Sequence, residues 1–312
     1  MDELSKTLEP KFDHRLKAHL KDINLTPVTR IPTERLCRTA LPKIGLIELV
    51  SATSFRRHYE DLYNAMFHAG ERERGDLIFT RLDDDFRGLR KGLFPFHIVG
   101  IRDHQGQAIA AAHFCVLLMP DGKHAVPYLN YIYVRPESRR QDLSELLHTL
   151  VLGITMADAQ LHARGGLVAE VPFTLCETEP VVHGEDDGKR AKAAERTRIH
   201  ARSGSVALML KRADDGRLIS SHVQPGLDPD DPPLTLIWVL RANPAHELVL
   251  EGDDMGRNLL EAYYRSMREE GFVEKNIALA ENMVQARWQG AEEFCLLPLS
   301  SVTRDMYVNV DS

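Results

Sequence analysis

The stretch from Pro127 to Leu150 constrains the fold of this chain more than any other part of its sequence. It reads PYLNYIYVRPESRRQDLSELLHTL. A β-prone apolar run, Tyr128–Val134, leads into Pro136, a polar turn with Arg139 and Arg140, and leucines at helical spacing. A helix that begins directly after a strand presents unpaired backbone N–H groups and the positive end of its dipole at one point. This arrangement predicts a site for a phosphate-bearing ligand.

The composition is that of an ordinary soluble globular protein. The chain has 312 residues, 43% hydrophobic and 27% charged, which allows one large domain or two modest ones. Its formal net charge of −7 argues against a general nucleic-acid binder. The four cysteines are far apart and lack zinc-binding spacing, so we expect reduced cysteines and a cytoplasmic protein. No apolar run approaches ~18 residues, and the N-terminus is highly charged, so we expect neither a membrane span nor a signal peptide.

Residues 1–42 mix charged residues, prolines and scattered leucines, and we treat them as an N-terminal extension. The spacing of Leu16, Leu20 and Ile23 predicts one short amphipathic helix. A strand is expected at Ile44–Val50, followed by a helix with an aromatic stripe. That stripe is either core or a wall of an acceptor pocket. It comprises Phe55, Tyr59, Leu62, Tyr63, Met66 and Phe67.

Three consecutive runs with short polar turns between them predict an antiparallel meander. The three strands are expected at Phe94–Ile101, Gln107–Met119 and Tyr128–Val134. The histidines in or near them lack the spacing of a ligand set, so we expect no metal site. They are His97, His104, His113 and His124.

The segment after the meander is expected to form a helix and a parallel strand. The helix should end near His162, before Gly165 and Gly166. The apolar run Leu167–Val171 predicts a strand that a right-handed crossover places parallel to the previous one. Its acid, Glu170, would have a raised pKa in an apolar strand, which suits a general base. The alternative is a buried acid paired with an arginine such as Arg198.

The second half of the chain contains a charged insertion and several more elements. The insertion, Glu177–Lys192, is expected to be mobile. The acidic run Asp83–Asp85, in the first half, is either a solvated loop or a lip that attracts a cationic amine. The remaining predicted elements are a helix at Glu195–Ser205, strands at Val206–Leu210 and Leu234–Leu240, helices at Asp253–Glu270 and Glu274–Trp288, and short strands at Phe294–Leu299 and Met306–Val310.

The stretch Val134–Ser144 resembles the central motif of the GCN5-related N-acetyltransferase (GNAT) family. In that motif a strand ending in Val-x-Pro precedes the turn Gln/Arg-x-x-Gly-x-Gly/Ala and an amphipathic helix. Asp142 stands at the first glycine of the turn, and Ser144 at the second small residue. Asp142 brings a Cβ and a negative charge to a place where backbone should approach a pyrophosphate.

Two further stretches resemble the same family. Residues 195–205 are similar to the motif Arg-x-x-Phe-Tyr-x-x-x-Gly-Phe, with Arg196, Ile199, His200 and Gly204 in its frame. Residues 222–240 resemble the last hairpin of bacterial GNAT-like proteins. The resemblance covers residues 44–242, with the motifs in the family's order.

The resemblance implies an α+β (α/β) fold: a GNAT-like mixed, mainly antiparallel sheet of about six to seven strands flanked by helices. It implies a division into residues 1–42, a GNAT-like acyltransferase domain at 43–242, and a mostly helical C-terminal extension at 243–312. The implied activity is that of an N-acetyltransferase, which moves an acetyl group from acetyl-CoA to an amine by direct attack. The acceptor would be a small molecule or a peptide. No metal, nucleic acid or membrane is implied, and a homodimer is an open option.

The resemblance also assigns roles to residues. Glu170 would be the general base. His200, at the family's Tyr position, would protonate the departing thiolate; its alternative is a surface histidine. Tyr131 would face the acceptor or pack on a helix. The pantetheine arm would bind along Ile132, Tyr133 and Val134, and the pyrophosphate in the turn of Arg139, Arg140, Gln141, Asp142, Leu143 and Ser144.

Two alternatives stay open. The chain can be a catalytically inactive GNAT-like domain, used for ligand sensing or protein interaction, in which Asp142 prevents the turn from binding phosphate. It can also use a donor other than acetyl-CoA, such as a longer acyl-CoA or an aminoacyl donor. The C-terminal extension has no motif that we recognise; it can cover the core, form a dimer contact or shape an acceptor site.

Overall fold

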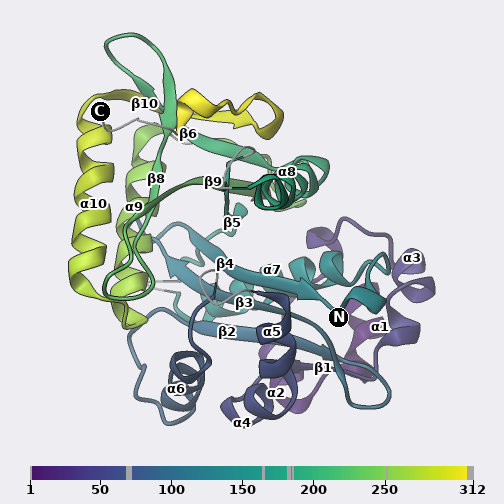
Figure 1. Ribbon diagram of the computed structural model, residues 1–312. Coiled ribbons are helices and arrows are strands. Elements are labelled where there is room, and N and C mark those ends of the chain that lie inside the picture. The colour runs from purple at the N-terminus through teal and green to yellow at the C-terminus, as the bar shows by residue number, and fades with distance from the viewer. Residues whose placement is uncertain are drawn as a thin grey trace. The chain divides into compact units, whose positions relative to one another are not determined.

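The computed structural model describes residues 2–67, 72–163, 166–180, 184, 186–250 and 252–307 (Figure 1). The chain divides into two compact units. The first unit comprises Met1–Leu118, Gly122–Val171 and Asn243–Ala245, and the second comprises Met119–Asp121, Pro172–Ala242 and His246–Ser312. We describe each unit by itself. The predicted three-part division of the chain stays a prediction.

The sheet of the first unit is the expected antiparallel meander. Its strands lie in the order β1 (Leu46–Leu49), β2 (Phe96–Arg102), β3 (Ala108–Leu118) and β4 (Ala125–Val134), each antiparallel to the next. The pairing of β3 with β4 is interrupted once. Tyr131 pairs with His113 and Leu129 with Phe114, so Asn130 is the extra residue of a β-bulge.

Helices cover both faces of this sheet (Figure 1). Successive side chains of a strand point to opposite faces. Accordingly, Phe96 and Ile98 of β2 join a buried cluster with the helices after β1, whereas His97 between them contacts Asp158 of α7. The helices are α1 (Glu3–Leu8), α2 (His14–His19), α3 (Thr33–Arg38), α4 (Ala52–Ser54), a π-helical turn at Phe55–Tyr59, α5 (Glu60–Met66), α6 (Gly75–Phe86) and α7 (Leu143–Leu161).

The aromatic stripe between β1 and α6 belongs to the core, which confirms one of its two expected readings. Phe55, Tyr59 and Tyr63 are fully buried. Tyr59 also donates a hydrogen bond of 2.9 Å to the buried carboxylate of Glu48. The ring lies so close to Gly100 that a Cβ built there would be 2.4 Å from Tyr59 Cζ. Strand β2 therefore needs glycine at this position.

The N-terminal extension is part of the folded first unit. Its leucines Leu4, Leu8 and Leu16 have no exposed surface. Leu25 packs so closely on α7 that a Cβ built on Gly153 would lie 2.4 Å from its Cδ2. The predicted helix through Leu16, Leu20 and Ile23 is shorter than expected, because α2 ends at His19.

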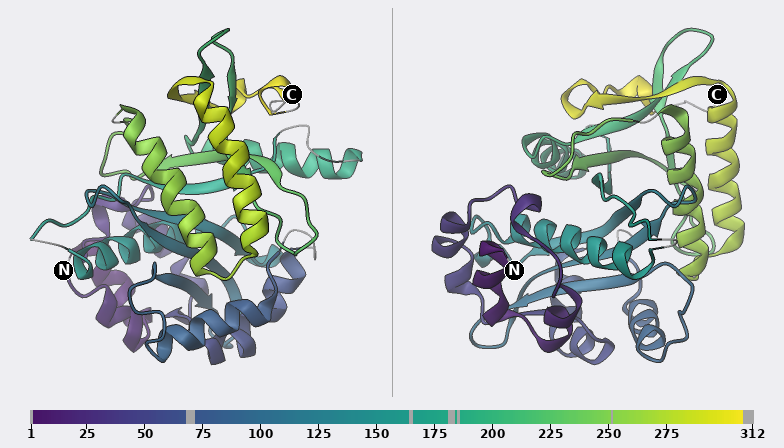
Figure 2. Two further views of the ribbon diagram at one scale, coloured as in Figure 1. Left: turned by 90° about the vertical axis from the view of Figure 1, so that its left-hand side faces the viewer. Right: turned by 180° about the vertical axis from the view of Figure 1, so that it is seen from behind.

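The second unit contains the remaining strands. Strands β5 (Phe173–Thr178), β9 (Leu234–Ala242), β6 (Val206–Arg212) and β10 (Ala291–Pro298) lie in that order with antiparallel pairing. Short strands β7 (Leu218–Ser220) and β8 (His222–Gln224) pair with β6 and β9. The helices are α8 (Asp187–Arg202), α9 (Gly252–Glu269) and α10 (Glu274–Gln289), of which α9 and α10 lie side by side (Figure 2).

Most predicted elements are confirmed, and four predictions are wrong. The acidic run Asp83–Asp85 is not a loop, because it lies in α6. Residues Leu167–Val171 do not form a strand: Glu170 makes only an isolated parallel bridge with His124, and the strand begins at Phe173. The insertion is shorter than expected, because Glu177 lies in β5 and α8 begins at Asp187. The described residues contain ten strands, more than expected, in a mixed and mostly antiparallel α/β arrangement.

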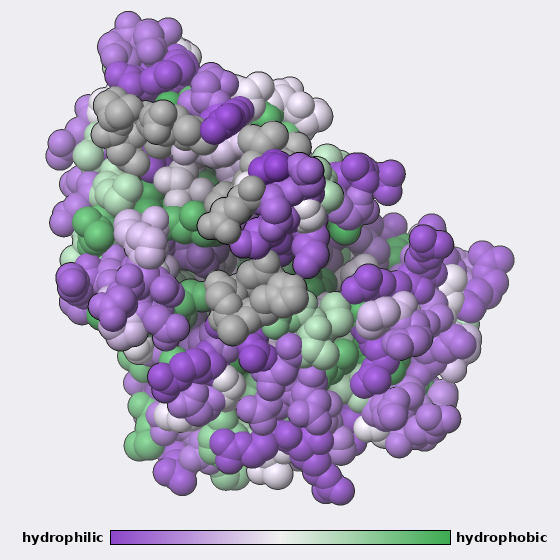
Figure 3. Space-filling model, in the orientation of Figure 1, coloured by the Kyte–Doolittle hydropathy of each residue, from purple (hydrophilic) through white to green (hydrophobic). Residues whose placement is uncertain are grey.

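Parts of three predictions fall outside the described residues, namely Gly165, residues 181–183 and 185 of the predicted mobile insertion, and residues 308–310 of the last predicted strand. The face drawn in Figure 3 is mostly hydrophilic, with small separate apolar patches. Among the described helices, none has the length and apolar character needed to cross a membrane.

Candidate functional site

The turn between β4 and α7 has an unusual backbone. After a 3-10 turn at Pro136–Ser138, both Arg140 (φ 61°) and Asp142 (φ 58°) adopt the left-handed conformation. They are the non-glycine residues with positive φ in the described part of the chain. That conformation costs an ordinary residue about 1–2 kcal/mol, and such residues are concentrated at ligand sites. Left-handed residues in turns also bring successive backbone N–H groups together into anion-binding concavities.

The arginines of this turn have different surroundings. Arg135 is occupied, because its Nε and Nη2 donate to the carbonyl of Ala108 at 3.0 and 2.8 Å. Arg139 and Arg140 are exposed. Arg139 makes only a long contact of 3.4 Å with the Val134 carbonyl, and Arg140 has no partner among the described residues. Two guanidinium groups are therefore available beside the N-terminus of the 19-residue helix α7.

Asp142 does not play the role that the sequence suggested. It begins α7 without a side-chain cap hydrogen bond. Its carboxylate instead accepts from Arg35 Nε at 2.7 Å and Nη2 at 2.6 Å, and from Thr39 Oγ1 at 2.9 Å. Hydrogen bonding to Arg35 holds the pKa of Asp142 below its ordinary value. The negative charge that was expected to repel a pyrophosphate is thus paired with a cation of the N-terminal extension.

Tyr131 and Tyr133 follow the bulge and pack into an aromatic cluster. The Tyr131 hydroxyl accepts from the Glu73 backbone N–H at 2.9 Å, and its ring meets Tyr63 edge-on at 5.1 Å. Tyr133 is buried, and its hydroxyl lies 2.9 Å from His113 Nε2. Tyr131 is only partly buried, so its ring remains a candidate lining of an acceptor site.

Glu170 is not the buried acid that was expected. Its side chain is exposed, and only its backbone is fixed, by hydrogen bonds of 2.8 Å with Lys123 and Ala125. The suggested partner, Arg198, pairs instead with Glu195. Glu170 therefore lacks the apolar surroundings on which its expected role as a base rested, and that role stays a prediction.

His200 lies in the second unit, on α8. Its Nδ1 is 4.0 Å from the sulfur of Cys176. Burial, together with Arg241 and Arg196, lowers the pKa of His200 to about 4. An imidazole with this pKa is neutral at pH ~7, so it suits a proton acceptor better than the predicted proton donor.

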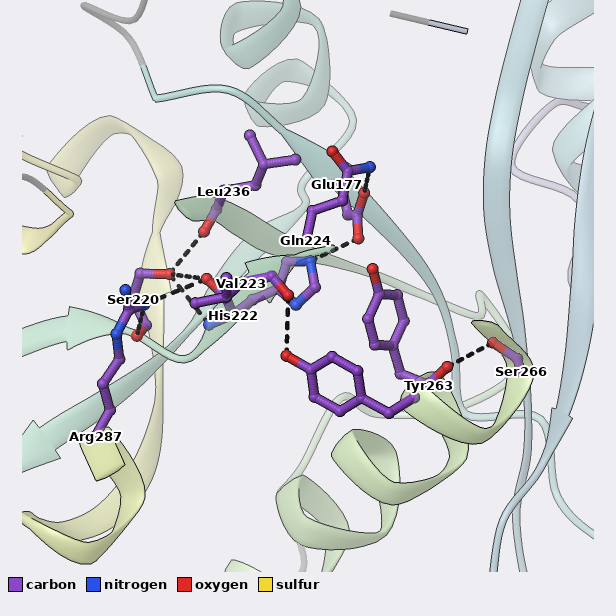
Figure 4. Close-up of polar contacts among 10 residues, drawn as sticks. Glu177, Ser220, His222, Val223, Gln224, Leu236, Tyr263, Ser266 and Arg287 are labelled. Carbon is purple, nitrogen blue, oxygen red and sulfur yellow. Dashed lines mark hydrogen bonds and ion pairs between the residues drawn. The ribbon is translucent and has the colours of Figure 1, made fainter. Parts of the chain in front are cut away.

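A second polar cluster of the same unit was missed by the sequence reasoning (Figure 4). Glu177 Oε1 lies 2.6 Å from His222 Nε2, and Gln224 Nε2 donates to Glu177 Oε2 at 3.0 Å. His222 is fully buried and stacks on Trp238 with ring centroids 4.5 Å apart. Burial lowers the pKa of His222, and Glu177 opposes that effect. No local motif predicts this pair, because 45 residues separate its members.

Two further features could receive a ligand. A pocket of roughly 300 Å³ lies between α9 and α10, next to Arg257, Tyr264 and Trp288. In the first unit, His19, His97 and Asp158 bring their donor atoms within 4.8 Å of one another. The spacing of the histidines along the chain did not reveal this group.

Comparisons with known proteins give no family. No protein-family model matches the chain, and no curated protein matches it. One similar structure is a fungal multi-domain GH3 beta-N-acetylglucosaminidase with a GCN5-related glucosamine N-acetyltransferase region (15% identity, TM-score 0.34, 55% of this chain and 18% of that chain). Another is a putative acyl-CoA N-acyltransferase from Klebsiella pneumoniae subsp. pneumoniae MGH 78578 (18% identity, TM-score 0.25, 54% and 88%). This chain spans less than a fifth of the fungal one, and at these TM-scores neither likeness carries an argument.

Proposed function

We propose that the chain is an acyl-CoA-dependent N-acyltransferase that binds the pyrophosphate of its donor in the turn before α7. The observation that carries this proposal is the pair of left-handed residues, Arg140 and Asp142, between a bulged strand and a long helix. Backbone N–H groups, the helix dipole and two exposed guanidinium groups all favour an anion at that point. The paired charge of Asp142 removes the main objection from the sequence.

The proposed reaction moves an acyl group from sulfur to nitrogen. The amine attacks the thioester carbonyl carbon, a C–N bond forms, the C–S bond breaks, and the thiolate leaves. A backbone N–H near Asn130 to Ile132 would stabilise the developing oxyanion, since a bulge leaves ladder groups unpaired. Backbone groups of Ile132–Val134 would hold the pantetheine arm. We keep Glu170 as the candidate base that takes the amine proton, with Tyr131 beside the acceptor.

The acceptor is proposed to be an amine of a small molecule or a peptide, and the first donor to test is acetyl-CoA. A second candidate function is supported by the surroundings of the predicted acid and base. Glu170 is exposed, and burial keeps His200 neutral near pH ~7. A GNAT-like domain that binds acyl-CoA without transferring the acyl group would have these properties. Binding without release of free thiol, across a panel of amines, would identify that case.

The turn is tested by reversing one charge. Isothermal titration with acetyl-CoA and with free CoA should give micromolar binding to the wild-type protein. Arg139→Glu should weaken it at least about tenfold, because a charge-assisted hydrogen bond is worth about 1.5–3 kcal/mol. Arg57→Glu is the matched control, since Arg57 is an exposed arginine on the π-helical turn of the same unit.

Two results would count against the proposal. Equal affinity of Arg139→Glu and Arg57→Glu for acetyl-CoA would show that the turn is not part of the binding site. Absence of heat and of thermal stabilisation at millimolar acetyl-CoA, with wild-type protein, would exclude an acyl-CoA site altogether.

A further inference from the structure

Three residues from distant parts of the chain converge on one point of the first unit. They are His19 at the end of α2, His97 in β2 and Asp158 in α7. His97 Nε2 lies 2.8 Å from Asp158 Oδ2, and His19 Nε2 lies 3.2 Å from Oδ1. The side chains are 15% (His19), 12% (His97) and 4% (Asp158) exposed, so the carboxylate is enclosed while one edge of the group reaches solvent.

The arrangement is costly unless something compensates for the buried carboxylate. Removing a carboxylate from water costs several kcal/mol, by order of magnitude, unless a cation or several donors face it. Both imidazoles turn the same ring nitrogen, Nε2, toward the carboxylate. The two nitrogens face different oxygens of the carboxylate, and one donor atom from each of the three residues lies within 4.8 Å of the others.

We propose that His19, His97 and Asp158 bind one divalent ion of the zinc type, which fastens α2 to β2 and α7. Imidazole nitrogens with a carboxylate oxygen are a common ligand set for Zn²⁺, with bonds of about 2.0–2.2 Å. Atoms bound to one tetrahedral ion at that length lie about 3.3 Å apart. The His19 separation of 3.2 Å is close to this value, and the His97 separation of 2.8 Å is shorter. Ca²⁺ and Mg²⁺ prefer oxygen ligands and are disfavoured by two imidazoles. Water would be the fourth ligand, on the side where His19 and His97 are partly exposed.

This site is separate from the proposed acyl-CoA turn. Asp142 stands at the N-terminus of α7 and Asp158 in its last turns, about 24 Å farther along at roughly 1.5 Å per residue. The inference therefore does not depend on the proposed function. Its expected consequence is structural, because the ion would join the N-terminal extension to elements that follow much later in the sequence.

The test is a titration of chelator-treated, dialysed protein with ZnCl₂. We expect one Zn²⁺ to bind per chain, with a micromolar or lower dissociation constant. His19→Ala and His97→Ala should each weaken binding at least about a hundredfold, because each removes one of three ligands. His246→Ala is the matched control; it removes an exposed histidine of the second unit and should bind as the wild type does. Co²⁺ in place of Zn²⁺ should give visible ligand-field bands that are absent in His97→Ala.

A second measurement distinguishes loss of the metal site from a folding defect in the variants. Zn²⁺ should slow proteolytic cleavage of residues 1–42 in wild type and in His246→Ala, and have no effect in His19→Ala. His19 is the most exposed of the three, so its variant should keep the apo fold by circular dichroism. Zn²⁺ binding that persists in His19→Ala and His97→Ala would overturn the proposal. So would wild-type protein that binds no Zn²⁺ at micromolar concentration, and the three residues would then be a hydrogen-bonded network only.

Discussion

His113 should make the first unit less stable in mild acid. Its side chain is fully buried, with Nε2 2.9 Å from the Tyr133 hydroxyl and its ring stacked on Tyr63 at 5.1 Å. Burial lowers the pKa of His113 from the ordinary 6.5 to about 3. The unfolded chain therefore binds a proton that the folded chain excludes. This contribution to stability is complete above pH 6.5 and is lost as the pH falls from there toward about 3.

The size of the effect follows from those two values. Between pH ~7 and pH ~5, proton linkage through this one imidazole gives a loss of about 2 kcal/mol in the free energy of unfolding. The variant His113→Gln cannot titrate, yet it keeps an acceptor for the Tyr133 hydroxyl. Wild-type protein should lose about 2 kcal/mol more than this variant over the same pH range. Tyr133→Phe is the matched control: it should be less stable at every pH and keep the wild-type pH dependence.

Urea unfolding followed by far-ultraviolet circular dichroism measures the difference. Both tryptophans, Trp238 and Trp288, belong to the second unit, so their fluorescence follows that unit alone and supplies an internal reference. Equal pH dependence for wild type and His113→Gln would refute the reasoning. An NMR titration of the His113 imidazole with a midpoint near 6.5 would refute it independently.

Two further predictions concern the first unit. Gly100→Ala should lower its free energy of unfolding by about 1–3 kcal/mol, because the new Cβ would meet the buried ring of Tyr59; an unchanged urea midpoint would show that the ring can move. In Asp142→Asn the new residue still tolerates the left-handed conformation. The substitution removes a negative charge and frees Arg35, so acetyl-CoA should bind about two- to fivefold more tightly. Weaker binding in the same titration would mean that the ion pair itself shapes the turn.

Local patterns were sufficient for most of the fold. Alternating apolar runs and polar turns predicted the meander β2–β4, and the leucine spacing predicted α7. The failure at Leu167–Val171 has a physical reason. Two short apolar runs follow one another there, and the one that becomes a strand, β5, is chosen by its pairing with β9, which begins at Leu234. Pairing between segments this far apart is not encoded in either run alone.

The candidate site also has features that the sequence predicted and features that it did not. The strand–turn–helix arrangement around Arg139 and Arg140 was readable because all of its parts are adjacent in the sequence. The surroundings of Asp142 were not, since its partner Arg35 lies 107 residues earlier. The exposure of Glu170 was also missed, because an acid within an apolar run looks buried until the neighbouring segment takes the strand position.

The contact between Arg35 and Asp142 has a consequence for the order of events during translation. Asp142 lies 107 positions after Arg35, so it is synthesised about 5–20 s later at roughly 5–20 residues per second. During that interval the apolar side chains of the N-terminal extension that pack on α7, namely Leu20, Ile23 and Leu25, have been synthesised before α7 exists to cover them. The nascent chain of this protein should therefore be a chaperone client until α7 emerges, and a stall in translation before residue 142 should promote its aggregation.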